Sequence, residues 1–147
     1  MKLELKHLAP YLPYGLEVNA NDSDLGIKNF TGEISSWEYY NTRFNVWSEY
    51  KLESHMVSIK NIKPILRPLS SMTEKESDEL EDIIGCNFYI YVSGNGIEIE
   101  DIIIDPWGGQ SVLRMETLNR IYEWLFAHHF DVFNLIENNL AIDKTKM

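Results

Sequence analysis

The chain has 147 residues, a length typical of one domain, and 44% of them are hydrophobic, enough for one core. Its 23 acidic and 13 basic residues give a formal net charge of -10, which disfavours direct binding to nucleic acid. The single cysteine, Cys86, excludes an internal disulfide and a zinc knuckle, and no apolar run is long enough to span a membrane. With no secretory pattern at the N-terminus, we expect one cytoplasmic domain over residues 1–147.

The first part of the chain predicts several strands after a turn-rich start. These strands are "GLEVNA" (15–20), "GIKNFTGEIS" (26–35), "FNVWSEYKL" (44–52) and "HMVSIKNI" (55–62). In the third strand, alternate positions are apolar, which predicts one buried face and one exposed face. The apolar positions of that strand are Phe44, Val46, Tyr50 and Leu52. Trp47 lies on the opposite parity, with Glu49, so it is a candidate binding residue.

A helix is predicted after an extended segment in the middle of the chain. Pro64 and Pro68 indicate that "KPILRPLSS" is an edge strand or a connector, since proline donates no ladder hydrogen bond. Thr73 and Glu76 then match a capping box, and Gly85 ends the helix. Its expected buried stripe is Leu80, Ile83 and Ile84.

This helix is strongly acidic. Residues 73–82 hold six acids and one lysine. Glu76 and Glu79 are therefore candidate binding residues for a basic protein partner, such as a host or defence protein that an acidic inhibitor would engage. The alternative is an ordinary solvated helix face.

A hairpin is predicted next, with "NFYIYV" and "IEIEDIIID" on either side of an Asn-Gly turn. Glu98, Glu100 and Asp105 form a carboxylate cluster of the kind that holds Mg²⁺. This cluster favours, as the alternative function, a small metal-dependent hydrolase or nuclease. However, residues 99–113 contain no basic residue to assist such chemistry. The solvent-exposed face of a strand explains the cluster better. We therefore predict no cofactor and no metal.

The longest helix is predicted over residues 114–129, where apolar residues recur at helical spacing. Its expected buried residues are Leu118, Ile121, Tyr122, Leu125 and Phe126. Trp124 and Arg120 lie off this stripe and are candidate binding residues, unless another segment covers Trp124.

"HHFD", residues 128–131, contains two adjacent histidines and a carboxylate. Adjacent helical residues point about 100° apart, so His128 and His129 do not face one metal. Asp131 fits better as the N-cap of a short helix, "VFNLIENN", flanked by Phe130 and Leu135 at the hydrophobic staple positions.

This order of elements predicts an α+β fold: a mainly antiparallel sheet with one acidic helix and C-terminal helices packed on it. Three stretches resemble a family of small uncharacterised proteins from Bacteroidetes prophages and other mobile elements. They are "LAPYLPYGLEV", "IKPILRPLSSMTEKE" and "LFAHHFDVFNLIENNLAID". The resemblance implies a bacterial or phage setting but brings no catalytic residues. We therefore expect a non-catalytic interaction protein with an unknown protein partner.

Overall fold

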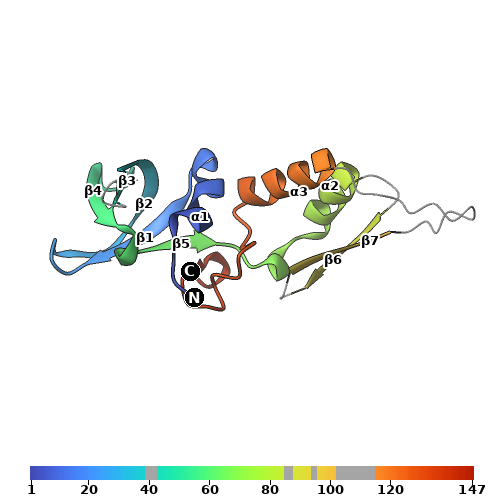
Figure 1. The fold of residues 1–147 in the computed structure, drawn as a ribbon. Helices are drawn as coiled ribbons and strands as arrows, with labels where there is room; N and C mark the ends of the chain where they lie inside the picture. The colour runs from blue at the N-terminus through green and yellow to red at the C-terminus, as the bar shows by residue number, and fades with distance from the viewer. Residues whose placement is uncertain (39–42, 85–87, 94–95, 102–114) are drawn as a thin grey trace, which may run out of the picture.

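The computed structural model describes residues 1–38, 43–84, 88–93, 96–101 and 115–147 (Figure 1). The α+β class is confirmed, because a mostly antiparallel six-stranded sheet is combined with helices. In the part of the chain that the structure describes, no helix is long and apolar enough to cross a membrane.

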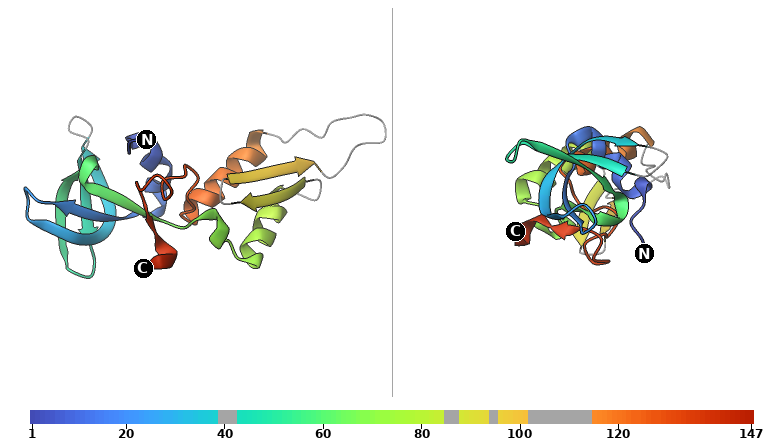
Figure 2. Two further views of the ribbon diagram at one scale, coloured as in Figure 1. Left: turned by 90° about the horizontal axis from the view of Figure 1, so that it is seen from below. Right: turned by 90° about the vertical axis from the view of Figure 1, so that its left-hand side faces the viewer.

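The sheet has the order β4-β3-β2-β1-β5-β8, and β5 and β8 are its parallel pair. Its strands are β1 (Glu17–Asp22), β2 (Ile27–Glu38), β3 (Arg43–Ser48), β4 (Glu53–Ser58), β5 (Ile62–Leu66) and β8 (Ile142–Asp143). Short helical elements flank them: α1 (Leu5–Leu8), η1 (Ala9–Tyr14), η2 (Ile59–Asn61), η3 (Leu69–Ser71) and η4 (Lys144–Lys146). Seen end-on, the sheet curls around its inner face (Figure 2).

The predicted alternation in β3 holds only as far as Ser48. Phe44 and Val46 are fully buried, but Tyr50 is 98% exposed and Leu52 is 76% exposed. The expectation that these last two residues are buried was therefore wrong. The chain leaves the strand at Ser48, whose carbonyl accepts a hydrogen bond from the Leu52 amide. Leu52 has φ of 54°, a left-handed conformation that ends any strand alternation.

The segment around Pro64 is a strand inside the sheet, not the edge or connector that its prolines suggested. β5 pairs with β1 on one side, where Pro64 lies opposite Val18, and with β8 on the other. Pairing with β8 involves Ile65 and Leu66, so it begins after Pro64 and does not need the missing amide hydrogen.

The curl of the sheet depends on Gly32 in β2. An added Cβ at this position would collide with the backbone carbonyl of Trp47 in β3. A bulge between Ile34 and Ser36 increases the bend further along the same strand. Gly32 thus lets β3 approach closely enough to give the sheet its curved outer face.

The second group of elements lies beside the sheet (Figure 1). It consists of α2 (Glu74–Ile84), the strands β6 (Phe88–Ser93) and β7 (Gly96–Asp101), and α3 (Met115–Ala127). The predicted hairpin is confirmed, since β6 and β7 pair antiparallel from Phe88–Asp101 to Ser93–Gly96. The predicted capping box of α2 is confirmed as well: the Thr73 amide donates to Glu76 at 2.8 Å, and the Glu76 amide donates to the Thr73 hydroxyl at 3.3 Å.

The helix α3 is the longest helix among the described residues, as predicted. Ile121 and Leu125 are buried, and Leu118 and Phe126 are half-buried. Tyr122 is 43% exposed, so its predicted burial was wrong. It lies at the margin of the apolar stripe and stacks on Phe126 instead, with the ring centroids 6.1 Å apart.

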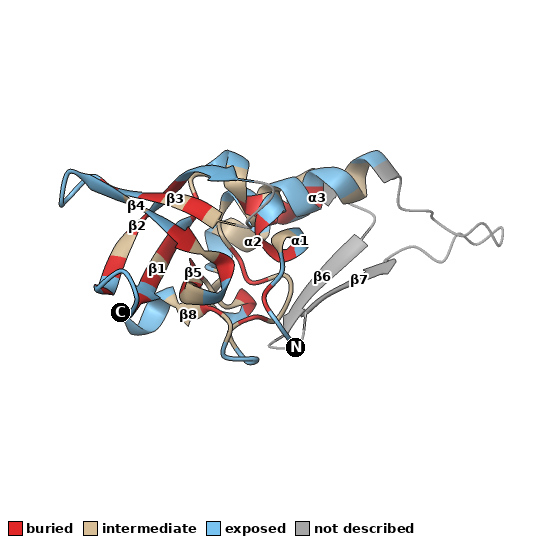
Figure 3. Ribbon diagram, turned by 60° about the vertical axis from the view of Figure 1, so that its left-hand side comes forward, coloured by how far each residue is buried: buried red, intermediate tan, exposed pale blue. Residues whose placement is uncertain are grey.

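Buried apolar side chains form two clusters, and we name two lobes after them (Figure 3). The sheet lobe comprises the described residues of 1–66 and 131–147, and the helical lobe those of 67–130. The described cluster of the helical lobe consists of Leu69, Leu80, Ile121, Leu125 and Phe130. The chain passes between the lobes at Arg67 and again at Phe130, which form a bridge to each other.

Candidate functional site

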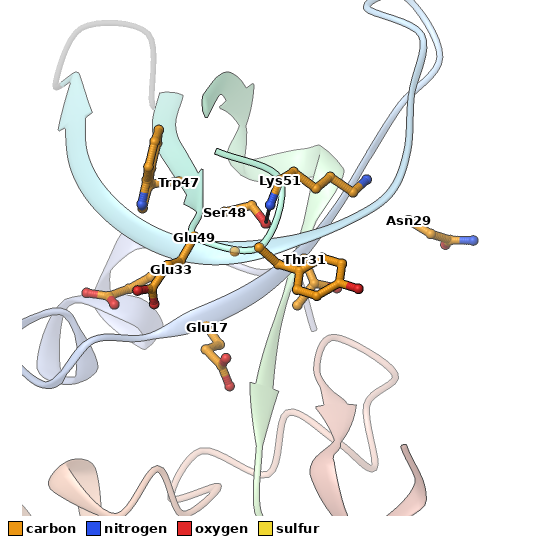
Figure 4. A pocket seen from close by; sticks show the side chains of 10 residues that line it. Glu17, Asn29, Thr31, Glu33, Trp47, Ser48, Glu49 and Lys51 are labelled. Carbon is orange, nitrogen blue, oxygen red and sulfur yellow. Dashed lines mark hydrogen bonds between the residues drawn. The ribbon is translucent and has the colours of Figure 1, made fainter. Parts of the chain in front are cut away.

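A groove of about 910 Å³ lies on the outer face of the sheet, over β1, β2, β3 and the turn after β3. The lining residues that matter here are Glu17, Glu33, Trp47, Glu49, Tyr50 and Lys51. Trp47, a predicted binding residue, is 40% exposed in this groove. The Glu33 and Glu49 side chains lie beside each other below Trp47, and Lys51 extends away from them (Figure 4).

Strand register brings the acidic and aromatic side chains of the groove together. Glu17 in β1 lies directly opposite Glu33 in β2, and Glu33 lies directly opposite Trp47 in β3. Side chains in such pairs point to the same face and stand about 4.5–5.5 Å apart at Cβ. The three side chains therefore form a row across the outer face of the sheet.

The charge of this row is poorly balanced. Glu17 pairs with Lys144 at 3.1 Å, but the Glu33 and Glu49 carboxylates have no hydrogen bond or ion pair with any residue that the structure describes. Like charges directly opposite each other on neighbouring strands destabilise a sheet. The groove thus has an excess of negative charge beside an exposed indole, which suits a cationic ligand.

Sequence reasoning found Trp47 but missed Glu17, Glu33 and Tyr50 as its neighbours. Glu49 shares the exposed parity with Trp47, so the alternation of β3 already pointed to it. The register that sets Glu17 and Glu33 beside Trp47 is a property of strand pairing, and no local pattern reveals it.

A second polar cluster, which we call the joint, connects the two lobes and consists of Tyr11, Arg67, Glu76, Phe130 and Asp131. It brings together the three stretches that carry the family resemblance, one from each part of the chain. The Tyr11 hydroxyl donates to the Phe130 carbonyl at 2.7 Å, and the Asp131 amide donates to the Arg67 carbonyl at 2.8 Å. These hydrogen bonds hold the two lobes together.

Glu76, predicted to bind a basic partner, is already bound within the protein. Its two oxygens accept from the Arg67 guanidinium at 2.7 and 3.0 Å, and its side chain is 17% exposed. Hydrogen bonds from Arg67 hold the pKa of Glu76 at about 2. Arg67 also covers the Phe130 ring, 4.4 Å from its centroid. Glu76 therefore has a structural role within the fold, and its role in binding a partner stays a prediction.

The other predicted binding residues of the helical lobe lie apart from the groove. Trp124 is half-buried and stacks on His128, with ring centroids 3.9 Å apart, and on Phe130 at 5.8 Å. These two neighbours in the same lobe cover part of its ring. Arg120 is exposed on α3, and Glu79 pairs with Lys75 at 3.6 Å on α2.

The adjacent histidines belong to the end of α3. The amides of His129 and Phe130 donate to the carbonyls of Phe126 and Leu125, a hydrogen-bond pattern that closes a helix C-terminus. His129 has φ of 55°, and a nitrogen of its ring lies 3.0 Å from the Tyr14 carbonyl. Burial lowers the pKa of His129, which favours the neutral ring. These contacts give the histidine pair a structural role.

The Asp131 carboxylate accepts backbone hydrogen bonds, but it is not the predicted N-cap of a helix. Its two oxygens accept hydrogen bonds from the amides of Leu135 and Ile136, each at 2.8 Å. Residues 132–139 form turns, so the predicted short helix after Asp131 was wrong. Left-handed conformations at Asn134 and Asn139 interrupt any helix there. Burial raises the pKa of Asp131, and the two backbone amides oppose that shift.

The carboxylates of the predicted metal site fall in or after β7. Glu98 and Glu100 lie opposite Tyr91 and Tyr89 in the hairpin, and Asp105 lies outside the described residues. Within the described ranges, no three His, Cys, Asp or Glu residues are grouped so that they could hold a metal ion. No protein-family model, curated protein or solved structure matches the chain.

Proposed function

We propose that the protein is a non-catalytic interaction module of a phage or another mobile element, which acts in the cytoplasm and docks a basic segment of a partner protein in the Trp47 groove. The bacterial and phage setting rests on the family resemblance of the three stretches described above. The docking site rests on the row of Glu17, Glu33 and Trp47 across the outer face of the sheet.

The row supports a cationic partner because the two carboxylates of Glu17 and Glu33 lie opposite each other and share a single positive counter-charge, that of Lys144. Lys144 neutralises part of the charge of Glu17, and an incoming lysine or arginine would neutralise Glu33. The Trp47 ring and the exposed Tyr50 ring add a cation–π surface on which such a side chain packs its charged end. Arginine suits this site best, since its flat guanidinium stacks on an indole while it donates to a carboxylate.

The acidic helix α2 is a weaker docking surface. Glu76 is held by Arg67 and Glu79 is paired with Lys75, so two of its acids are already engaged. Among the acids that remain, Glu81 is exposed on the helix surface, outside the strand register that sets Trp47 opposite Glu33.

Affinity capture from the native host tests the proposal when groove and helix variants are compared. The full chain with Glu33→Gln and Trp47→Ala is expected to lose the partner that the parent captures. The control, Glu79→Gln with Glu81→Gln, removes the same kind of charge from α2 and is expected to keep it. Retention by the groove variant, or loss by the helix variant alone, contradicts docking in the groove.

A photo-crosslinking amino acid at Tyr50 provides the direct contact test, because this side chain is 98% exposed at the rim of the groove. It should crosslink to the captured partner within a lysine- or arginine-rich peptide. The same amino acid at Tyr122, an exposed position on α3, should give no such crosslink.

A further inference from the structure

A smaller pocket of about 350 Å³ lies beside β1 and β5; it shares no lining residue with the Trp47 groove and adjoins it where Asn19 donates to Thr31. The N-terminal segment, β1, η2, the start of β5 and Leu140 form its walls. Leu3, Ile59 and Ile62 belong to the buried core of the sheet lobe, and the small part of each that is exposed (8%, 9% and 3%) gives the pocket a small apolar floor. A ligand in this pocket would meet that floor with its apolar part.

The rim of the pocket is basic. Three of its lining residues are lysines, namely Lys2, Lys60 and Lys63, and its described lining holds no acidic residue. In a chain with a formal net charge of -10, this local charge stands out against the average of the surface. Lysine is a compact point charge with three donors, which makes it a phosphate binder.

These lysines are available to a ligand. Lys2 and Lys60 have no side-chain hydrogen bond or ion pair with any residue that the structure describes, and Lys63 donates to Asn139 at 3.0 Å. The nearby carboxylate of Asp22 does not compete for them, because it accepts from the Asn61 side chain at 2.7 Å and from two backbone amides.

Each side-chain amide on the rim uses one of its two N–H donors within the protein. Asn19 donates to Thr31 at 3.2 Å, Asn21 donates to Asn19 at 2.6 Å, and Asn61 donates to Asp22. Each of these amides keeps one N–H donor, so the lysine ammonium groups are the charged donors of the rim and the side-chain amides are additional neutral ones. Three ammonium groups match a phosphate monoester, which carries about -1.5 to -2 charges at neutral pH, better than a carboxylate with one charge.

We propose that this pocket binds a small organic phosphate, with the phosphate on Lys2, Lys60 and Lys63 and an apolar substituent on the floor of Leu3, Ile59 and Ile62. The site is separate from the groove and does not depend on the function proposed for it. It is too small for a duplex, and it recognises a single phosphate group with an apolar body.

Titration of the full chain by NMR, with phenyl phosphate as the probe, tests this assignment. Saturable shifts are expected at the backbone amides of residues 59–63, without matching shifts at residues 47–51. Inorganic phosphate, which lacks the apolar part, and benzoate, which has a carboxylate instead, should both bind more weakly. Equal binding of benzoate overturns the phosphate assignment, and equal binding of inorganic phosphate overturns the role of the floor.

Lysine variants locate the phosphate. Lys60→Gln with Lys63→Gln is expected to weaken phenyl phosphate binding by about tenfold or more, since a hydrogen bond to a charged group is worth about that factor. The matched control, Lys28→Gln, changes an exposed lysine on β2 and should bind like the parent. Trp47→Ala should also leave binding unchanged. An absence of saturable shifts, or parental affinity in the double lysine variant, overturns the proposal.

Discussion

Charged and aromatic side chains meet at two places in this protein, the joint and the Trp47 groove. In the joint, Arg67 lies between Glu76 and the Phe130 ring, and Tyr11 and Asp131 satisfy backbone groups. In the groove, the Glu33 and Glu49 carboxylates have no partner among the described residues and the Trp47 indole is half-exposed. The same residue types therefore stabilise the fold in one place and remain open to a partner in the other.

The difference shows why residue type alone does not identify a binding site. Burying a charge costs free energy unless the charge is paired, so an Arg–Glu pair that packs against an aromatic ring is typical of a structural role. Two exposed carboxylates opposite each other cost stability, and only Glu17 of this pair has a counter-charge among the described residues, which is why we propose a ligand at Glu33. The two sites should accordingly respond to mutation in opposite ways.

Aromatic truncation should separate the two sites most strongly. Phe130 is fully buried, so Phe130→Ala is expected to lower the free energy of unfolding by about 3–5 kcal/mol. Trp47→Ala removes a larger side chain but should cost less than Phe130→Ala, because the Trp47 side chain is 40% exposed and loses less of its burial. Urea denaturation of both variants measures the two losses. Similar losses would show that Trp47 is a packing residue and that the contrast between the sites is false.

Removal of the Asp131 carboxylate is expected to have the next largest effect. Asp131→Ala leaves the Leu135 and Ile136 amides without their acceptor, which should cost about 1–3 kcal/mol. Asp131→Asn keeps one acceptor oxygen but turns an NH2 group toward the other backbone amide, so it should recover only part of that loss. The same denaturation experiment with added chelator should give unchanged values. A lower stability of the parent in chelator would instead indicate a metal at the histidines.

Acid should weaken the joint through Glu76. Its pKa in the folded protein is about 2, below the usual 4.5, so the carboxylate stabilises the fold above pH 4.5. That contribution is lost as the pH falls from 4.5 toward 2, because protonation then breaks the pair with Arg67. Unfolding free energies of the parent and Glu76→Gln, measured across this range, should converge as the pH falls. A constant difference between the two proteins would mean that the pair contributes no stability.

The smallest effect is expected at the surface pair of Glu17 and Lys144. Their side chains are 48% and 47% exposed, so Lys144→Gln should change the free energy of unfolding by no more than about 1 kcal/mol. Binding of the basic partner should strengthen in this variant, because Glu17 then gives its full charge to the groove. Weaker binding after Lys144→Gln would show that the negative charge of this row does not attract the partner.

Local patterns in the sequence were enough for the elements whose causes are local. The capping box of Thr73 and Glu76, the Asn-Gly hairpin and the stripe of Ile121 and Leu125 depend on neighbours within a few residues, and all three are present. The stop of α3 at the histidines has a local cause as well. Short-range hydrogen bonds and side-chain periodicity determine such features, so a local stretch of sequence is enough to predict them.

Only the tertiary structure shows which polar residues have partners within the protein and which remain exposed without one among the described residues. Glu76 looks like a free acid in "TEKESDELED", and only the approach of Arg67 from the end of β5 makes it part of the joint. Glu17 and Glu33 become neighbours of Trp47 only through strand register, a long-range choice that no local spacing encodes. The sequence thus determined the elements of this protein, and the pairing between distant elements determined its candidate site.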